Sequence, residues 1–223
     1  YANSDFYILF NDICKTMPTL DHIVYAVPDF DQAIHDLEEK LGIRPEPGGR
    51  HLLRGTKNAL LNLGNSCYLE ILAIDHENTS FIGQRWMGMN LITQPTITRW
   101  SIQTNEIEKH SHIIKKQHQE LGKIADGERK TPEGETLKWK MTLPLPVPEI
   151  DVIPFLIDWS ASDFHPTDRL ETGCSIHSIS LYHPQPEMIE TLLEKLSLKM
   201  KVSFAVSPKI SNKNTSKNGI IEL

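Results

Sequence analysis

The chain has 223 residues and a formal net charge of −6, and 39% of its residues are hydrophobic. This length is enough for one large domain or two small ones with a real hydrophobic core. The acidic balance, with a pI near 5.9, argues against nucleic acid or an anionic membrane surface as a partner. The sequence contains no apolar run that approaches the roughly 18 residues of a membrane span.

Three cysteines, Cys14, Cys67 and Cys174, share no spacing typical of a metal site and leave an odd thiol. They favour a reducing setting over a disulfide scaffold, and they therefore predict a cytoplasmic protein. The beginning of the chain has a short apolar patch without a basic start, which is a poor match to a signal peptide. We interpret residues 1–16 as an upstream extension, or one added by cloning, before a natural start at Met17.

A repeat organises the chain, because residues 21–43 resemble residues 176–198 without a gap. In this alignment His22 meets His177, and a Glu-Lys-Leu sequence near the end of one copy meets the same three residues in the other. Each copy begins with an apolar, β-branched stretch and continues, after a turn with proline, into apolar residues at helical spacing. The pattern predicts a strand, a turn and a helix in both copies.

A second shared feature follows each copy, where a carboxylate interrupts a short apolar strand. In the first copy this carboxylate is Glu70, and in the second it is Glu222, near the end of the sequence. A buried carboxylate is costly unless a proton, a cation or a metal lies beside it. Because the two halves should be related by pseudo-symmetry, we expect both carboxylates to converge on one cation together with His22 and His177.

Between the two copies lies a third, more diverged unit of the same kind. It has Asp158 where the other units have their glutamate, but no histidine on its first strand, so it carries half a site at most. The long connection before it is typical either of a lid or binding element or of a loop that packs over a sheet end. The predicted division of the chain is an extension over 1–16, a βαβββ module over 17–76, a connecting loop over 77–97, a second module over 98–160, a linker over 161–173 and a third module over 174–223.

Paired βαβββ modules, with a histidine on the first strand and a glutamate on the last, resemble the vicinal oxygen chelate superfamily. The matching stretches are LDHIVYAVPDFDQA, GGRH, RGTKNALLNLG, YLEILA and IPFLIDW. They make the first 160 residues similar to its glyoxalase-like domain subfamily. The resemblance implies an α+β fold in which cupped mixed sheets grip a divalent metal, while substrate oxygens take the open coordination positions.

Carried over to this chain, the resemblance makes His22 and Glu70 one half of a metal site. The repeat makes His177 and Glu222 the other half, whereas a pairing of the first two modules would leave the first half and Asp158 without a second histidine. Two imidazoles and two carboxylates suit Zn²⁺, Ni²⁺, Mn²⁺ or Fe²⁺. The metal would polarise a carbonyl or enediolate oxygen while a glutamate, with Glu222 preferred to Glu70, removes a proton from the adjacent carbon.

The implied function is a metal-dependent lyase or isomerase of the glyoxalase kind that acts on a small oxygen-rich molecule, with ring-cleaving dioxygenase chemistry as the variant for an iron site. The alternative is a protein of the same fold that binds or sequesters a small molecule without turnover. The sequence contains no nucleophile elbow, phosphate-binding glycine loop or zincin helix. An odd number of modules would leave one cupped sheet exposed, which predicts a homodimer.

Four residues are candidates for substrate binding. His51 lies near Arg54, whose guanidinium fork suits an anionic group, although a solvated loop explains this pair as well. Trp100 could line a pocket or simply fill a core. Asp158, at the place of the missing glutamate, is the fourth candidate.

Overall fold

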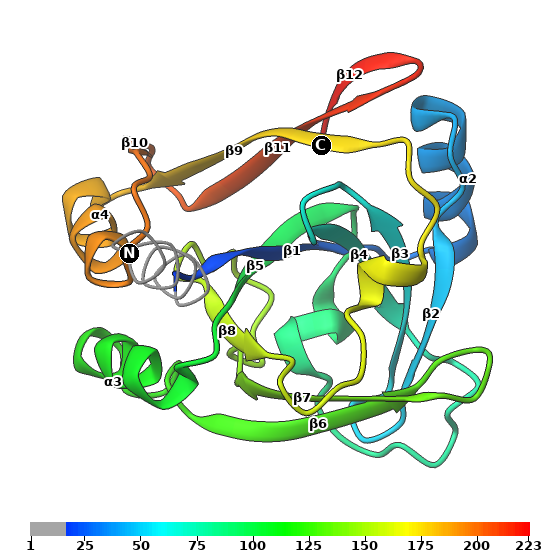
Figure 1. Cartoon of the computed structure of the whole chain (residues 1–223), viewed down its shortest axis with the longest axis horizontal. Helices are drawn as coiled ribbons and strands as arrows, with labels where there is room; N and C mark the ends of the chain where they lie inside the picture. The colour runs from blue at the N-terminus through cyan, green and yellow to red at the C-terminus, as the bar shows by residue number, and fades with distance from the viewer. Residues whose placement is uncertain (1–16) are drawn as a thin grey trace, which may run out of the picture.

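The computed structural model describes residues 17–223, and the predicted extension over residues 1–16 lies outside this described part. The chain forms an eight-stranded sheet and a separate four-stranded sheet, with helices around them (Figure 1). The elements follow in the order β1 (Thr19–Ala26), α2 (Phe30–Leu41), β2 (Glu46–His51), β3 (Thr56–Asn62), β4 (Tyr68–Ile74), η1 (Trp86–Leu91), β5 (Thr96–Gln103), α3 (Ile107–Gln117), β6 (Ile124–Lys130), β7 (Thr136–Thr142), β8 (Phe155–Asp158), η2 (Pro166–Arg169), β9 (Ser175–His183), α4 (Pro186–Lys195), β10 (Val202–Phe204), β11 (Lys209–Ser216) and β12 (Gly219–Glu222).

The first module arranges its strands in the order β2-β3-β4-β1, with β1 and β4 parallel to each other. A parallel pair needs a long crossover, and here α2 and the β2–β3 hairpin provide it. The side chain of Asp29 accepts a hydrogen bond from the backbone N–H of Gln32 and so caps the start of α2. The helix ends at Gly42, which adopts the left-handed conformation with φ 73°.

The second module repeats this plan with β5, α3, β6, β7 and β8, and β5 is parallel to β8. β1 and β5 pair antiparallel and join the two modules into one continuous sheet with the order β2-β3-β4-β1-β5-β8-β7-β6. The first module therefore pairs with the second and not with the third. The predicted four-residue site depends on a pairing of the first and third modules, and the structure does not contain that pairing.

The large sheet curls until its two outer strands, β2 and β6, contact each other. At this seam Gly49 lies so close to β6 that a Cβ atom would be 2.6 Å from the carbonyl oxygen of Lys130. Arg129 spans the seam, because its Nη1 donates a hydrogen bond to the carbonyl oxygen of Gly48. The sheet is thus a nearly closed cup.

The third module has the same order of elements but a different pairing. β9 has β10 on one side and β11 on the other, so both of its edges are occupied and β12 pairs only with β11. In the first module, by contrast, the last strand pairs directly with the first. Glu222 on β12 is therefore separated by a strand from β9, which carries His177.

Two apolar clusters cover the two faces of the large sheet, and neighbouring residues such as Ile23 and Val24 belong to different clusters. The outer cluster joins the sheet to α2, α3, α4 and the four-stranded sheet (Figure 1). The inner cluster contains Met87 and Met89, so the connection before β5 folds into the cup. The four-stranded sheet contributes Leu181 to the outer cluster, whereas Phe204 and Ile220 of the same sheet are exposed, and the homodimer stays a prediction.

These observations confirm the predicted fold class, an α+β protein of repeated βαβββ modules with a cupped mixed sheet. The helices α2, α3 and α4 lie outside the cup, and the polar side chains described below lie within it. Among residues 17–223, no helix is long and apolar enough to cross a membrane.

Candidate active site inside the cup

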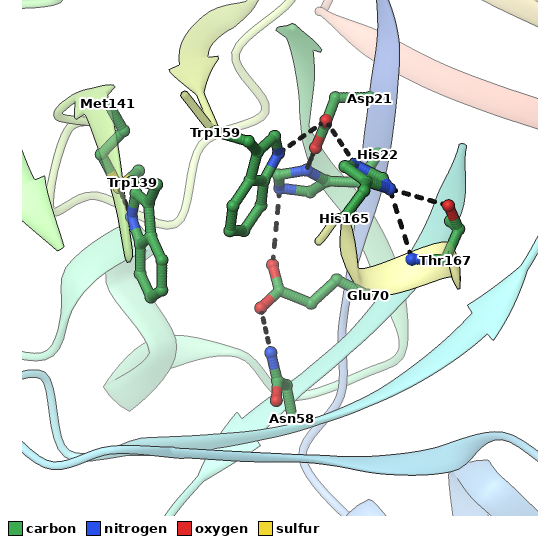
Figure 2. Close-up of polar contacts among 9 residues, drawn as sticks. All are labelled: Asp21, His22, Asn58, Glu70, Trp139, Met141, Trp159, His165 and Thr167. Atoms are coloured by element: carbon green, nitrogen blue, oxygen red, sulfur yellow. Dashed lines mark hydrogen bonds and ion pairs between the residues drawn. The ribbon is translucent and has the colours of Figure 1, made fainter. Parts of the chain in front are cut away.

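The inner face of the cup carries a row of buried polar side chains that begins at a β-bulge in β1. The register between β1 and β5 shifts between Leu20 and His22, which places Asp21 in the bulge. Neighbouring residues on a regular strand point to opposite faces, but a bulge changes this direction. Oδ1 of Asp21 is consequently 2.5 Å from Nδ1 of His22, and both side chains are buried (Figure 2).

Asp21 is the acceptor at the centre of this row. Nε1 of Trp159, which follows β8, donates a 2.9 Å hydrogen bond to Oδ2, and Nε2 of His165 lies 3.1 Å from the same oxygen. Burial by itself raises the pKa of the Asp21 carboxyl, but the hydrogen bonds and charges of His165 and His22 outweigh it, and the pKa is lowered. Asp21 is therefore an ionised acceptor that orients two imidazole rings.

His165 is held by η2, within the segment predicted to be a linker. The backbone N–H of Thr167 donates to Nδ1 of His165 at 3.3 Å, so Nδ1 is an acceptor and the ring proton lies on Nε2, facing Asp21. The carboxylate of Asp168 accepts a 2.9 Å hydrogen bond from the backbone N–H of His165 and completes a capping box. The turn thus fixes both the position and the tautomer of His165.

His22 connects Asp21 to Glu70 on β4. Because Nδ1 of His22 faces Asp21, Nε2 points toward Glu70, whose Oε2 is 3.7 Å away (Figure 2). The other carboxylate oxygen, Oε1, accepts a 2.7 Å hydrogen bond from Nδ2 of Asn58 on β3. His22 and Glu70 are 3% and 6% exposed. An imidazole held by one carboxylate and aimed at a second can accept a proton on Nε2 and be stabilised as an imidazolium.

Aromatic rings hold the His22 imidazole from two sides. Tyr68 stacks on it with ring centres 4.7 Å apart, and Phe155 approaches it edge-on at 5.1 Å. Burial raises the pKa of the Tyr68 hydroxyl well above its usual value, and the charges of Asp21 and Glu70 raise it further. Tyr68 is therefore a neutral packing partner of His22 and not an anion.

A cavity of about 1400 Å³ lies beside this row, between the β2–β3 hairpin and the β6–β7 hairpin. Asn58 belongs to its wall, whereas His22 and Glu70 do not. The Asn58 amide therefore separates the buried pair from the cavity. Seven basic and two acidic residues line the cavity although the whole chain is acidic; of the basic ones, Lys130, Lys138 and Lys140 are exposed, and Arg129 is buried. The basic residues are Arg50, Arg54, Lys57, Arg129, Lys130, Lys138 and Lys140, and the acidic residues are Asp126 and Glu128.

His51 lies in the cavity wall between two tryptophans. Its ring contacts Trp86 of η1 and Trp139 of β7 edge-on, with ring centres 5.5 and 6.5 Å apart. Burial lowers the pKa of His51 to about 4, an effect that the charge of Glu70 opposes and the charge of Arg129 reinforces. His51 is therefore a neutral imidazole at physiological pH.

Comparison with known proteins supports the family that the fold suggests. The profile of the glyoxalase-like domain family matches residues 20–197, from β1 into the segment after α4. The chain belongs to the glyoxalase-like domain family.

Two solved structures illustrate the range of structural similarity to this chain. A hypothetical protein from Staphylococcus aureus superposes with a TM-score of 0.63 at 16% identity, over 92% of this chain and 98% of that one, which supports the fold. Methylmalonyl-CoA epimerase from Mycobacterium tuberculosis reaches a TM-score of 0.41 at 18% identity, over 64% of this chain and 89% of that one. The second likeness is too weak to bear on activity. Comparison with curated protein sequences gives no match.

Glyoxalase-like proteins typically bind a divalent metal. To test whether this chain has the ligands for one, the positions of His22 and Glu70 in the first module are compared with the equivalent positions in the second. β1 and β5 have equal lengths and each precedes a helix by three residues, so His22 corresponds to Arg99. By the register of the neighbouring parallel strands, Phe155 corresponds to Glu70, so the prediction that Asp158 takes the place of the glutamate is wrong. A guanidinium and a phenyl ring do not coordinate cations, so the second half of the cup supplies no ligand at these two positions.

The second half of the predicted metal site lies elsewhere in this glyoxalase-like chain. His177 and Glu222 are exposed on the four-stranded sheet, and Glu222 forms an ion pair with Lys213 at 3.5 Å. Since His22 and Glu70 are buried in the cup, the four side chains do not converge, and the prediction that they do is wrong. Within residues 17–223, no three His, Cys, Asp or Glu side chains form a group that could hold a metal ion. The residues present do not fit a four-ligand metal centre.

The structure separates the four predicted substrate-binding residues into two pairs. His51 and Arg54 belong to the cavity wall, and the Arg54 guanidinium lies 5.4 Å from the ring centre of Trp86. Trp100 fills the outer core, where its Nε1 donates to a backbone carbonyl, and Asp158 accepts hydrogen bonds inside the turn after β8. Neither of these two belongs to the cavity wall.

Several residues of the site were not among the predicted ones. Asp21 and Asn58 interrupt apolar strands, and this polar interruption is a signal that the sequence contains. Trp159 and His165 lie in turns far from β1 in the sequence, and Arg129 lies on a strand with an ordinary polar alternation. Their roles depend on which segments meet in space, so no local pattern could have identified them.

Proposed function

We propose that the protein is a proton-transfer enzyme of the glyoxalase kind, an isomerase or lyase that acts on a small oxygen-rich organic anion in the cup. The observation that carries this proposal is the buried row Asp21–His22–Glu70 beside a cationic cavity. Two carboxylates that share one imidazole in a dry environment are unfavourable for stability, and such groups occur mainly at functional sites. A cytoplasmic location, inferred from the cysteine pattern, is part of the proposal.

In the proposed reaction, Glu70 removes a proton from the substrate carbon next to a carbonyl group. The substrate displaces the Asn58 amide from Oε1 of Glu70, and the amide then donates to the substrate oxygen that becomes negatively charged. The proton passes from Glu70 to Nε2 of His22, and the ionised Asp21 stabilises the resulting imidazolium. Return of the proton to the other face of the same carbon regenerates all three side chains; return to the neighbouring carbon does the same, with the hydroxyl proton of the enediol passing from one substrate oxygen to the other.

These steps use side chains alone, because His22 and Glu70 supply only two of the four ligands expected for Zn²⁺, Ni²⁺, Mn²⁺ or Fe²⁺. The ring-cleaving variant would need the same metal centre, so proton transfer is the reaction that the residues support. We expect dialysis against EDTA to leave the activity unchanged, and full loss with recovery on adding one of these metals would contradict this part of the proposal.

A second candidate function is binding without turnover. It is favoured by one observation, namely that His22 and Glu70 do not belong to the cavity wall in this conformation. In that case Asn58 would be the innermost group that a ligand contacts, and the carboxylate behind it would only orient the amide.

Hydrogen–deuterium exchange separates the two candidates. The protein is incubated in D₂O with a panel of 2-oxo acids, 2-hydroxy ketones and hemithioacetals, and proton NMR follows exchange next to the carbonyl. We expect catalysed exchange of at least one compound, and Glu70→Gln should slow it about 10²–10⁴-fold, as for loss of a general base. The matched control Glu222→Gln should leave the rate unchanged, since that carboxylate is exposed on the other sheet. Exchange that survives in Glu70→Gln contradicts the proposal, and binding without exchange supports the second candidate.

A further inference from the structure

Arg129 is a buried cation without a carboxylate partner in the part of the chain that the structure describes. It lies on β6 at the seam with β2, and 7% of the residue is exposed. Arg44, Arg50 and Arg169 each pair with a carboxylate, whereas Arg129 forms no ion pair within residues 17–223. The only acceptor that the described residues offer to its guanidinium is the carbonyl oxygen of Gly48. A guanidinium has five N–H donors, so most of its capacity remains for another partner.

Arg129 lines the same cavity as Asn58 and His51. Burial lowers the pKa of Arg129, and the charges of Glu70 and Glu133 oppose this effect only in part. The charge of Arg129 in turn lowers the pKa of His51 across the cavity. Within residues 17–223 Glu70 forms no ion pair with Arg129, and its two oxygens contact Asn58 and His22 instead. A buried and uncompensated positive charge favours the binding of an anion.

Besides Arg129, the cavity wall contains both polar side chains and apolar side chains. Asn58 and Trp86 line the cavity, and Oδ1 of Asn58 and Nε1 of Trp86 are buried without a hydrogen-bond partner among the described residues, so a ligand that moves the atoms covering them would find one acceptor and one donor. Trp139 and Met141 continue the wall as apolar surface. The cavity volume of about 1400 Å³ also exceeds the roughly 300–1,000 Å³ of ordinary ligand pockets. A ligand of three or four carbon atoms would leave most of it unfilled.

We propose that the cavity binds an amphipathic 2-oxo or 2-hydroxy acid whose carboxylate pairs with Arg129. The oxygen on its second carbon lies at Asn58, next to Glu70, and its apolar or aromatic tail packs against Trp86 and Trp139. The inference rests on the proposed function and names the substrate class for the same site. The guanidinium fork matches a carboxylate and a phosphate equally well, so the experiment includes both head groups.

Isothermal titration calorimetry of the full chain tests the head group. The probes are phenylpyruvate, its uncharged analogue phenylacetone, phenyl phosphate and inorganic phosphate. We expect phenylpyruvate to bind at least about tenfold more tightly than phenylacetone, which lacks the charge-assisted pair. Equal affinity of these two probes, or no binding of phenylpyruvate at millimolar concentration, overturns the proposal. Tighter binding of phenyl phosphate or inorganic phosphate than of phenylpyruvate overturns the assignment to a carboxylic acid.

Three variants test the anchor itself. Arg129→Gln should reduce phenylpyruvate affinity to that of phenylacetone, and Arg129→Lys, which keeps the charge but not the fork, should give an intermediate value. The matched control Arg44→Gln removes an exposed arginine outside the cavity and should bind like the wild type. If Arg129→Gln does not fold, the affinity of Arg129→Lys for phenylpyruvate tests the anchor alone. Wild-type affinity of Arg129→Lys would show that the carboxylate does not pair with both arms of the guanidinium, which overturns the proposal.

The outcomes for the anchor and for the proposed reaction are separable. Glu70→Gln should keep its phenylpyruvate affinity while losing deuterium exchange, and Arg129→Gln should lose the affinity. Retained affinity in Arg129→Gln overturns the anchor and leaves the reaction untouched. Tight binding through Arg129 with no exchange by the wild type instead overturns the reaction and leaves the anchor in place.

Discussion

His22 and His177 are the second residues of the two copies of one sequence repeat, yet one is buried and the other is exposed. His22 is on β1, in the middle of an eight-stranded sheet, and is 3% exposed. His177 is on β9, in a four-stranded sheet, and is exposed. Both copies form the strand and the helix that the repeat predicts. A sequence repeat therefore predicts a shared local structure. The burial of its polar residues depends instead on which other strands pair with the repeated strand.

The carboxylates of the two copies differ in the same way. Glu70 is buried between Asn58 and His22, and Glu222 pairs with Lys213 at the surface. The difference arises because β4 pairs with β1 inside the cup, while β12 can pair only with β11. Substitutions at the buried set should thus have large effects, and equivalent substitutions in the third module should have small ones.

The largest effect on stability is expected for Asp21→Ala. Three buried donors, from His22, Trp159 and His165, would lose their acceptor, which should lower the free energy of unfolding by about 3–5 kcal/mol. Urea denaturation at pH 7 measures this change. A loss below about 1 kcal/mol, the range of surface ion pairs, would show that the row is solvated and not a buried network.

The next effect is a dependence of stability on pH that originates at His51. Its pKa is about 4 in the folded protein and 6.5 in the unfolded chain, so the folded state resists protonation. The corresponding stability is complete above pH 6.5 and is lost as the pH falls toward 4, by about 3 kcal/mol in the limit. His51→Gln should remove this part of the pH dependence. Unfolding curves of both proteins at pH 7.5, 5.5 and 4.5 that change in parallel would contradict the assignment.

A smaller effect is expected for His165→Phe, which keeps a ring of similar size but removes the donor to Asp21. The free energy of unfolding should fall by about 1.5–3 kcal/mol, the usual range for one hydrogen bond to a charged group. The ¹⁵N resonances of His22 should also shift, because Asp21 would retain one imidazole partner instead of two. An unchanged His22 spectrum would mean that His165 only packs against its neighbours.

The smallest effects are expected in the third module. His177→Ala and Glu222→Gln should each change the free energy of unfolding by no more than about 0.5 kcal/mol, since both side chains are exposed. Thermal denaturation with and without added Zn²⁺ checks this prediction. If added Zn²⁺ stabilises the wild type and either substitution abolishes that stabilisation, the third module contributes ligands to a metal site and this prediction is wrong.

Much of the fold could be predicted from the sequence, while the site could be predicted only in part. The periodicities of the two repeat copies are local, and the strands and helices that they predict are present. The same patterns identified His22 and Glu70 as polar residues in buried strands. They could not show that Arg99 and Phe155 take the corresponding places in the second module, because that correspondence depends on the register between strands.

What this sequence determined by itself is the set of βαβββ modules, since hydrophobic periodicity and turn residues act over neighbouring positions. Only the tertiary structure decided that the first module pairs with the second. That pairing determines which residues belong to the site. Asp21 meets His22 through a bulge that the β1–β5 pairing creates, and His165 and Arg129 reach the cup from distant segments. The physical reason is that burial and electrostatic partnership depend on contacts between strands far apart along the chain, and local sequence patterns do not specify those contacts.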